Sequence, residues 1–226
     1  LHGHAFTDSV LKDIGVRYEV RNHEILESLP QGPFITISNH PYGSIDGLIL
    51  VDIFARLRPD YKVMVNKIIS RIHALDDNFI CVTPVGNERQ APSCDSIKGI
   101  KESVAHVRQG HPLGIFPSGA VSDLSLRDGC VRDREWQKPV IRIIGRLGVP
   151  VVPVTFLNRN SDFYYSLGLL DWRVRLLRLP SEVFNKKDRP AIVRIGDVIM
   201  PEEMERFTDP DGLSGYLRSK VYEALK

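Results

Sequence analysis

The feature that most constrains the fold is a short apolar run at residues 34–37, followed at once by a polar turn and a second apolar stretch. The turn reads Asn-His-Pro-Tyr-Gly-Ser-Ile-Asp-Gly over residues 39–47, and its Pro41 and Gly43 favour a change of chain direction. Residues 45–55 are mostly apolar and long enough for a helix. We therefore predict a strand, a tight turn and a mostly buried helix.

The same alternation continues along the chain. Short apolar or alternating runs predict strands, and apolar residues at helical spacing predict helices. The expected strands cover residues 15–21, 34–38, 61–65, 113–116, 151–156 and 191–198, and the expected helices cover residues 45–55, 95–108, 139–147 and 213–225. This pattern predicts an α/β fold, a single domain over residues 1–226 whose central mixed, largely parallel sheet is flanked by helices.

The first turn holds a histidine and an aspartate that can act together. The expected strand brings His40 to its C-terminal end, and Asp46 lies at the start of the expected helix, where negative charge is favourable. A carboxylate on one imidazole nitrogen fixes the tautomer and leaves the other nitrogen free to accept a proton. An Asx-type turn with a surface histidine is the alternative, and spacing alone does not decide between the two.

A second turn follows the expected strand at residues 113–116 and contains Pro117, Ser118, Gly119 and Ser122. Its backbone N–H groups and serine hydroxyls can form an anion cradle or an oxyanion site, although a plain proline-glycine turn is the alternative. If the two preceding strands run parallel, both turns meet at one edge of the sheet. Open α/β sheets bind ligands at such an edge.

These two turns and the Val-Pro block at residues 149–154 resemble, in the same order, the motifs of the glycerolipid acyltransferases, the lysophosphatidate acyltransferase superfamily. The first turn is similar to the family's Asn-His…Asp motif, and residues 115–122 are similar to its Phe-Pro-Glu-Gly-Thr-Arg-Ser block. The resemblance covers a motif-bearing core at about residues 34–156. It implies transfer of a fatty acyl group from acyl-acyl carrier protein or acyl-CoA to a hydroxyl of a lyso-lipid, with His40 as general base and Asp46 orienting it.

The departures from the family pattern are informative. Five residues rather than four separate His40 from Asp46, and Ser118 and Val121 replace the family's Glu and Arg. These differences resemble a branch labelled hemolysin, which includes acyltransferases that complete ornithine and glycine aminolipids. In the family, the Glu and Arg help to arrange the acceptor's phosphate, so their loss favours an acceptor without glycerol phosphate, such as a lyso-aminolipid.

The resemblance extends to a set of substrate-binding residues. Arg89 lies where the family keeps an arginine-bearing block, which makes it a candidate anion contact, with a solvated loop arginine as the alternative. Asn39 is expected to hold the turn through side-chain hydrogen bonds, and Tyr42 to line the pocket or simply to pack. The expected set is Asn39, Tyr42, Gly43, Arg89, Pro117, Ser118, Gly119 and Ser122.

The composition of the chain limits which classes of partner it is expected to bind. With 42% hydrophobic and 26% charged residues and a net charge of +2, the 226-residue chain gives no signal for nucleic-acid binding. Its three cysteines are far apart, which favours reduced thiols in the cytoplasm. No ligand cluster suggests a metal, and no run reaches the roughly 18 apolar residues of a membrane span. We expect no cofactor beyond the thioester co-substrate, and a peripheral protein on the inner face of the cell membrane.

Residues 162–180 combine aromatic residues and leucines with Arg173, Arg175 and Arg178. Such a segment suits a membrane-facing element on anionic lipid, or a core-packed helix with a charged face. His106, on the expected helix at residues 95–108, is expected to face solvent. Two other functions stay open: a serine hydrolase with Ser118 as nucleophile, and a non-catalytic lipid-binding or membrane-perturbing protein.

Overall fold

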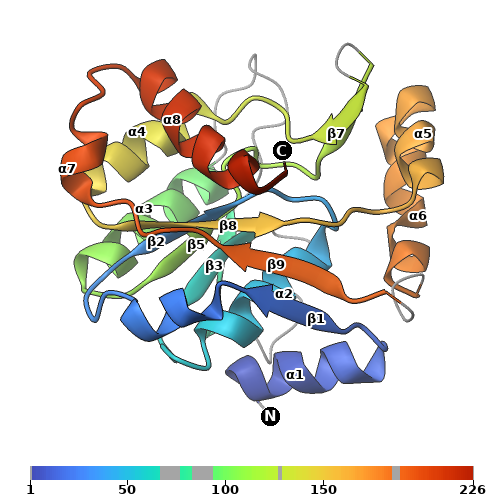
Figure 1. Cartoon of the computed structure of the whole chain (residues 1–226), viewed down its shortest axis with the longest axis horizontal. Coiled ribbons are helices and arrows are strands. Elements are labelled where there is room, and N and C mark those ends of the chain that lie inside the picture. Colours follow the sequence, from blue (N-terminus) through green and yellow to red (C-terminus); the bar gives the residue numbers. More distant parts are fainter. Residues whose placement is uncertain (1, 67–76, 83–93, 127–128, 185–188, 226) are drawn as a thin grey trace.

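A seven-stranded sheet in the order β1-β9-β8-β2-β5-β3-β4 forms the centre of the molecule (Figure 1). The computed structural model describes residues 2–66, 77–82, 94–126, 129–184 and 189–225. The strands of this sheet are β1 (Tyr18–Arg21), β2 (Ile35–Ser38), β3 (Lys62–Asn66), β4 (Phe79–Val82), β5 (Leu113–Ile115), β8 (Val151–Phe156) and β9 (Ala191–Ile195). Strands β8, β2, β5, β3 and β4 run parallel, whereas β9 is antiparallel to β8 and pairs in parallel with β1. The predicted mixed, largely parallel sheet is confirmed.

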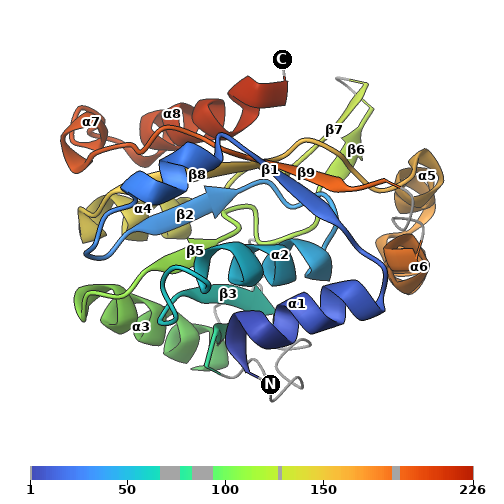
Figure 2. The same cartoon turned by 60° about the horizontal axis from the view of Figure 1, so that its bottom comes forward.

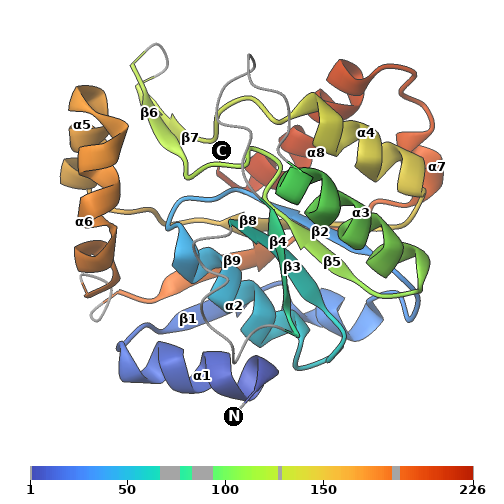
Figure 3. The same ribbon diagram turned by 180° about the vertical axis from the view of Figure 1, so that it is seen from behind.

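Helices cover both faces of the sheet and divide the core in two. They are α1 (Gly3–Asp13), α2 (Ser44–Phe54), α3 (Cys94–Arg108), α4 (Lys138–Leu147), α5 (Asp162–Leu170), α6 (Trp172–Phe184), α7 (Pro201–Met204) and α8 (Pro210–Tyr222), with 3-10 turns at His23–Ser28 and Glu223–Leu225. One core joins α1 and α2 to one sheet face, and the other joins α3, α4, α7 and α8 to the opposite face (Figure 3). Strand β2 shows the alternation, because Ile35 and Ile37 point into the second core and Phe34 into the first.

Helix α2 is buried on every side. Residues 45–55 are all buried, because the helix lies between the sheet and α1 (Figure 2). A helix that is apolar around its whole circumference is expected to be buried in this way. One of its two buried carboxylates, Asp52, accepts hydrogen bonds from Tyr18 of β1 and Arg56. The helix that carries Asp46 is therefore fixed from all directions.

The parallel pairing of β2 with β5 and β8 places the functional turns together. Thr36 of β2 lies between Gly114 of β5 and Val152 of β8, so the C-terminal ends of all three strands meet at one edge. The turn at residues 39–43 follows β2, and the turn at residues 116–122 follows β5. The expected common sheet edge is thus observed.

Two antiparallel hairpins extend from this edge. The strands β6 (Asp123–Ser125) and β7 (Cys130–Arg132) form a small separate sheet. Helices α5 and α6 pack against each other beyond the ends of β8 and β9, at one side of the molecule (Figures 1 and 3). None of the helices in the described residues is long and apolar enough to cross a membrane.

Some helices and strands of the structure were not predicted from the sequence. Helix α1, strand β4 and the β6–β7 hairpin were not predicted, since each has a short or irregular apolar pattern. The expectation that His106 faces solvent is wrong. Its side chain is buried, with Nε2 3.2 Å from the carbonyl oxygen of Pro112 and the ring stacked on His111.

Gly114, in the middle of β5, provides a test of this packing. A Cβ at this position would lie 2.2 Å from the hydroxyl of Tyr61, which is fully buried and hydrogen-bonded to Thr36. We expect Gly114→Ala to lower the free energy of unfolding by about 2 kcal/mol, because overpacking a closed core forces side chains off their rotamers. Urea denaturation measures the loss. In a double-mutant cycle, the same substitution should cost less in a Tyr61→Phe background, and an equal cost in both backgrounds would contradict the assigned clash.

Candidate active site

The turn after β2 folds Asp46 back onto His40. Nδ1 of His40 lies 2.8 Å from Oδ2 of Asp46, which occupies the first turn of α2. Gly43 precedes the helix with a φ of +85°, a conformation that few residues other than glycine adopt. The local sequence therefore explains the geometry: Pro41 and Gly43 turn the chain, and the helix start holds the carboxylate.

The carboxylate of Asp46 is fully buried. Its Oδ2 also accepts the backbone N–H groups of Tyr42 at 3.0 Å and of Gly43 at 3.1 Å. Burial raises the pKa of the Asp46 carboxyl, and the hydrogen bonds from His40 and the two N–H groups oppose that rise. With three donors on one oxygen, the side chain has a single orientation, and so does the ring bonded to it.

The imidazole of His40 is held on its face as well as at its edge. It stacks on Phe116, with ring centroids 4.0 Å apart. Its side chain keeps 17% of its surface exposed, whereas Asp46 keeps none. Within the described residues, Nε2 makes no hydrogen bond. A partly exposed ring that is held at Nδ1 and has no hydrogen bond at Nε2 in the described residues has the arrangement that a general base requires.

The backbone of His40 is anchored by two residues that sequence analysis did not connect with it. Its N–H donates to Oδ1 of Asp133 at 3.1 Å, and its carbonyl accepts the N–H of Ser122 at 2.9 Å. The Ser122 hydroxyl donates to the same Oδ1 at 2.5 Å. Asp133 is buried and is held in turn by α8, where Tyr222 and Arg218 bond its backbone. Nothing in the local sequence around Asp133 signals this role, since its partner is 93 residues away.

The other residues of the first turn are structural in the observed contacts. Asn39 bonds both backbone groups of Phe156, at 2.9 and 2.8 Å, and so clamps the end of β2 to β8, as expected. Tyr42 is buried, with its ring edge-on to Phe156. A Cβ on Gly43 would lie 3.1 Å from Leu179 of α6. Packing is the contact that the structure shows for the Tyr42 ring, and its place among the substrate-binding residues stays a prediction.

The second turn is largely closed by its own hydrogen bonds. The N–H of Gly119 donates to Phe116, and the hydroxyl of Ser118 donates to the carbonyl of Ala120 at 2.8 Å. Gly119 has a φ of +66°, and a Cβ there would lie 2.1 Å from Nε2 of Gln137, which itself donates to the Ser118 carbonyl. Pro117 accepts the Gln137 N–H. Ser118 is buried and not bonded to His40 in the described residues, so the geometry does not support a Ser–His nucleophile pair.

The sequence suggested roles for two arginines, Arg89 and Arg175. Arg89 lies outside the described residues. Two roles were left open for Arg175, a basic residue on a membrane-facing surface or part of a packed helix, and its buried guanidinium favours the second. Nη1 of Arg175 donates to the Ser122 carbonyl at 3.0 Å and to Asp123, and its charge lies over the ring of Tyr164. Arg175 therefore ties helix α6 to the second turn.

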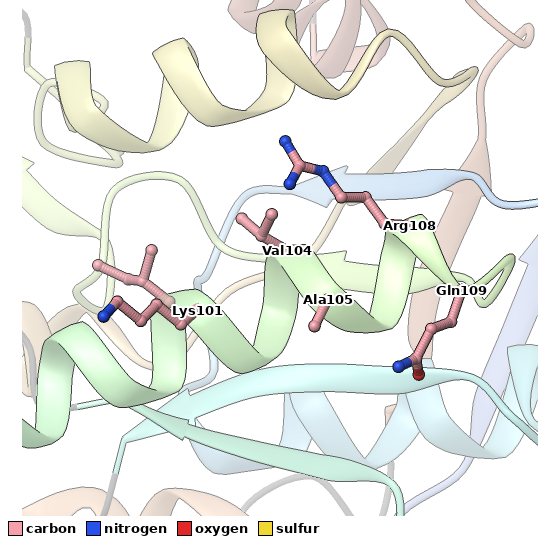
Figure 4. A pocket seen from close by; sticks show the side chains of 6 residues that line it. Lys101, Val104, Ala105, Arg108 and Gln109 are labelled. Carbon is pink, nitrogen blue, oxygen red and sulfur yellow. The ribbon is translucent and has the colours of Figure 1, made fainter.

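A surface hollow on helix α3 lies apart from this site. A cavity of about 480 Å³ lies along the surface of α3, and the labelled side chains around it all extend from that one helix (Figure 4). Its lining residues are Ile100, Lys101, Val104, Ala105, Arg108 and Gln109. A wall from a single helix contains none of the residues that surround His40.

Comparison with known proteins agrees with this geometry. A family model described as "Acyltransferase" matches residues 1–224. The chain belongs to this acyltransferase family. Two curated relatives are both named lyso-glycine lipid O-acyltransferase: one from Bacteroides thetaiotaomicron, 26% identical over 96% of this chain and 79% of that protein, and one from Phocaeicola vulgatus, 24% identical over 96% and 77%.

The fold of this acyltransferase also matches a solved structure. The crystal structure of the 1-acyl-sn-glycerophosphate acyltransferase PlsC from Thermotoga maritima superposes with a TM-score of 0.62 and 15% identity, covering 98% of this chain and 76% of that one. The match concerns the fold. The resemblance inferred from the three sequence motifs is thereby confirmed at the level of family and architecture, and the roles of individual site residues stay predictions.

Asp133 offers a test of how the His40 backbone is held. We expect Asp133→Ala to lower kcat for acyl transfer roughly 10- to 100-fold with little change in KM, because a small displacement of a catalytic group is costly. Asp133→Asn keeps an acceptor oxygen at Oδ1 and should recover most of that loss. Steady-state kinetics gives both constants, and thermal melting separates misfolding from misplacement. A folded alanine variant with the wild-type kcat would refute the anchoring role.

Proposed function

We propose that this acyltransferase moves a fatty acyl group from a thioester carrier to a hydroxyl of a lyso-lipid, with His40 as general base. The contact that carries the proposal is the 2.8 Å pair between Nδ1 of His40 and Asp46, which leaves Nε2 without a hydrogen bond to any described residue, on a side chain that is partly exposed at the sheet edge. The donor is acyl-acyl carrier protein or acyl-CoA, the two soluble forms in which a fatty acyl thioester is carried.

The reaction needs no covalent intermediate on the protein. Nε2 of His40 takes the proton from the acceptor hydroxyl as its oxygen attacks the thioester carbonyl. The negative charge on the neighbouring Asp46 stabilises the imidazolium that forms. When the tetrahedral intermediate collapses, the carbon–sulfur bond breaks and the imidazolium returns its proton to the departing thiolate. The products are an ester and a free thiol, and the histidine is neutral again.

The developing oxyanion requires a donor near this proton path. In the second turn the N–H groups of Gly119, Ala120 and Ser122 already have acceptors. The N–H groups of Ser118 and Val121 are without a hydrogen bond in the part of the chain that the structure describes. We assign the Val121 N–H as the oxyanion donor, because Val121 adjoins Ser122, whose N–H bonds the His40 carbonyl.

A lyso-aminolipid is the acceptor that these observations favour. The relatives named for lyso-glycine lipid acylation align over almost the whole chain. The second turn offers Ser118 and Val121, neither of which can neutralise a phosphate. An N-acylated amino acid with a free hydroxyl on its acyl chain provides the required nucleophile without a phosphate.

The α5–α6 hairpin supports contact with a membrane surface. Large apolar side chains on it are exposed, with Leu170 at 81% and Leu177 at 82%. The other members of this apolar face are Phe163, Leu169 and Val174. The hairpin is bonded directly to the catalytic turn, because the Tyr165 hydroxyl donates to the Pro41 carbonyl at 2.9 Å. A lipid surface that receives this face would therefore lie beside His40.

Among the described residues, Cys130 is a free thiol. Reduced thiols agree with a reducing compartment, where both thioester donors are made. We accordingly propose a peripheral position on the cytoplasmic face of the cell membrane.

Substitution of His40 tests the chemistry. We expect His40→Ala to lower kcat by about 10²–10⁴-fold, the usual contribution of a general base. Asp46→Asn should also lower kcat, because an amide N–H facing Nδ1 would favour the wrong tautomer. The assay is mass spectrometry of the acylated lipid formed from N-(3-hydroxyacyl)glycine and either donor. His23→Ala, which changes an exposed histidine, is the matched control, and a His40→Ala enzyme with wild-type turnover would exclude the mechanism.

The membrane contact has its own test. Replacing Leu170 and Leu177 together by serine should weaken binding to vesicles containing phosphatidylglycerol by roughly tenfold or more, since each leucine that leaves water contributes about 1.5–3 kcal/mol. Vesicle co-sedimentation measures the partition coefficient. Leu57→Ser removes an exposed leucine next to α2 instead, and should leave binding unchanged. Equal binding by the double variant and the wild type would remove the hairpin as the docking face.

A further inference from the structure

A second cavity lies between the β6–β7 hairpin and helix α5. Its volume is about 210 Å³. Its lining residues are Asp123, Leu124, Arg134, Tyr165, Gly168 and Leu169. The polar side chains in its wall come from the β-hairpin segment, and the apolar ones come mostly from helix α5. One side of the cavity is therefore polar and the other is mostly apolar. None of its residues is used by the proposed acyl-transfer chemistry.

The charged side chains that line the cavity, taken together with Arg175 buried directly behind its wall, carry a net positive charge. Asp123 pairs with both Arg134 and the buried Arg175, so two guanidinium groups face one carboxylate. Arg134 bonds Asp123 through Nε alone, and its terminal amino groups make no hydrogen bond within the described residues. A guanidinium with its terminal edge open is suited to grip a carboxylate with two parallel hydrogen bonds.

Arg175 adds a second cation directly beneath the wall. A Cβ on Gly168 would lie 2.9 Å from Cδ of Arg175 and 3.5 Å from its Nε, so only glycine lets the two elements approach this closely. Nε of Arg175 is buried and has no hydrogen-bond partner in the described part of the chain. An unsatisfied buried cationic N–H beside a cavity strengthens the local attraction for an anion.

The cavity adjoins both the catalytic turn and the apolar face. Tyr165 in its wall bonds Pro41, the residue after His40, and Asp123 follows Ser122, whose N–H bonds the His40 carbonyl. On the other side, Leu169 is about half exposed and belongs to the apolar face of the hairpin. A lipid whose chain contacts that face would bring its head group to the arginines.

We propose that this cavity binds the carboxylate of the lyso-aminolipid head group, with Arg134 as the principal contact. The assignment rests on the proposed function and names the part of the acceptor that the protein recognises. Two arginines against one aspartate leave a single positive charge, which one carboxylate neutralises. A phosphate monoester carries up to two negative charges, and would be left with an excess in a cavity of this size.

A matched pair of acceptors tests the assignment. N-(3-hydroxyacyl)glycine and its methyl ester differ only in the charge of the head group. We expect Arg134→Gln to raise KM for the acid roughly tenfold or more, as the loss of a hydrogen bond to a charged group implies, with kcat nearly unchanged. KM for the ester should stay the same. Arg146→Gln, which changes an exposed arginine of α4, is the control and should alter neither value.

Two outcomes overturn the assignment: equal effects of Arg134→Gln on acid and ester, or no effect on either. A lysophosphatidate acceptor used more efficiently than the acid, in a manner that depends on Arg134, would also overturn it in favour of a phosphate. If the wild-type enzyme acylates none of these lipids, the proposed function is wrong, and calorimetry with a short-chain N-(3-hydroxyacyl)glycine decides the cavity alone. Binding by the wild type that Arg134→Gln abolishes supports the site, and absent or equal binding refutes it.

Discussion

The fixed position of one buried carboxylate determines the geometry of the reactive edge. Asp46 has no exposed surface, yet one of its oxygens receives the His40 ring and two backbone N–H groups. A buried charge is tolerated only where donors surround it, and the loss of one partner from such a group typically costs about 3–5 kcal/mol. The strand, the tight turn and the apolar helix α2 are what bring those donors together. The pairing of His40 with Asp46 thus depends on the packing that excludes water around Asp46.

The parts of this arrangement that are local in sequence could be predicted, and the distant parts could not. Residues 34–55 contain the strand, the turn and the helix, so the approach of Asp46 to His40 follows from the pattern of proline, glycine and apolar positions. Asp133 sits in a polar stretch that resembles any charged loop. Its hydrogen bond to the His40 backbone is created only when the β6–β7 hairpin and α8 are in place. Pairings of this kind have no local signature.

Arg175 is a second residue whose position depends on distant packing and could not be predicted from the local sequence. In the sequence it is one of three arginines among leucines, a composition typical of a membrane surface. In the fold it is buried and bonded to Ser122 and Asp123, while the exposed character of the segment comes from leucines such as Leu170 and Leu177. Composition therefore does not show which residues of the segment are exposed, because only the packing of α5 on α6 decides which residues turn inward.

Close approach of Gly43 to Leu179 links the first motif to a helix much later in the chain. The positive φ of Gly43 directs its backbone N–H toward the carboxylate of Asp46. Leu179 of α6 occupies the space that a side chain at position 43 would need. A larger residue at either position would have to displace the other. Evolutionary change in α6 is therefore restricted at this contact. Relatives with a different residue before α2 should carry a compensating, smaller residue opposite it.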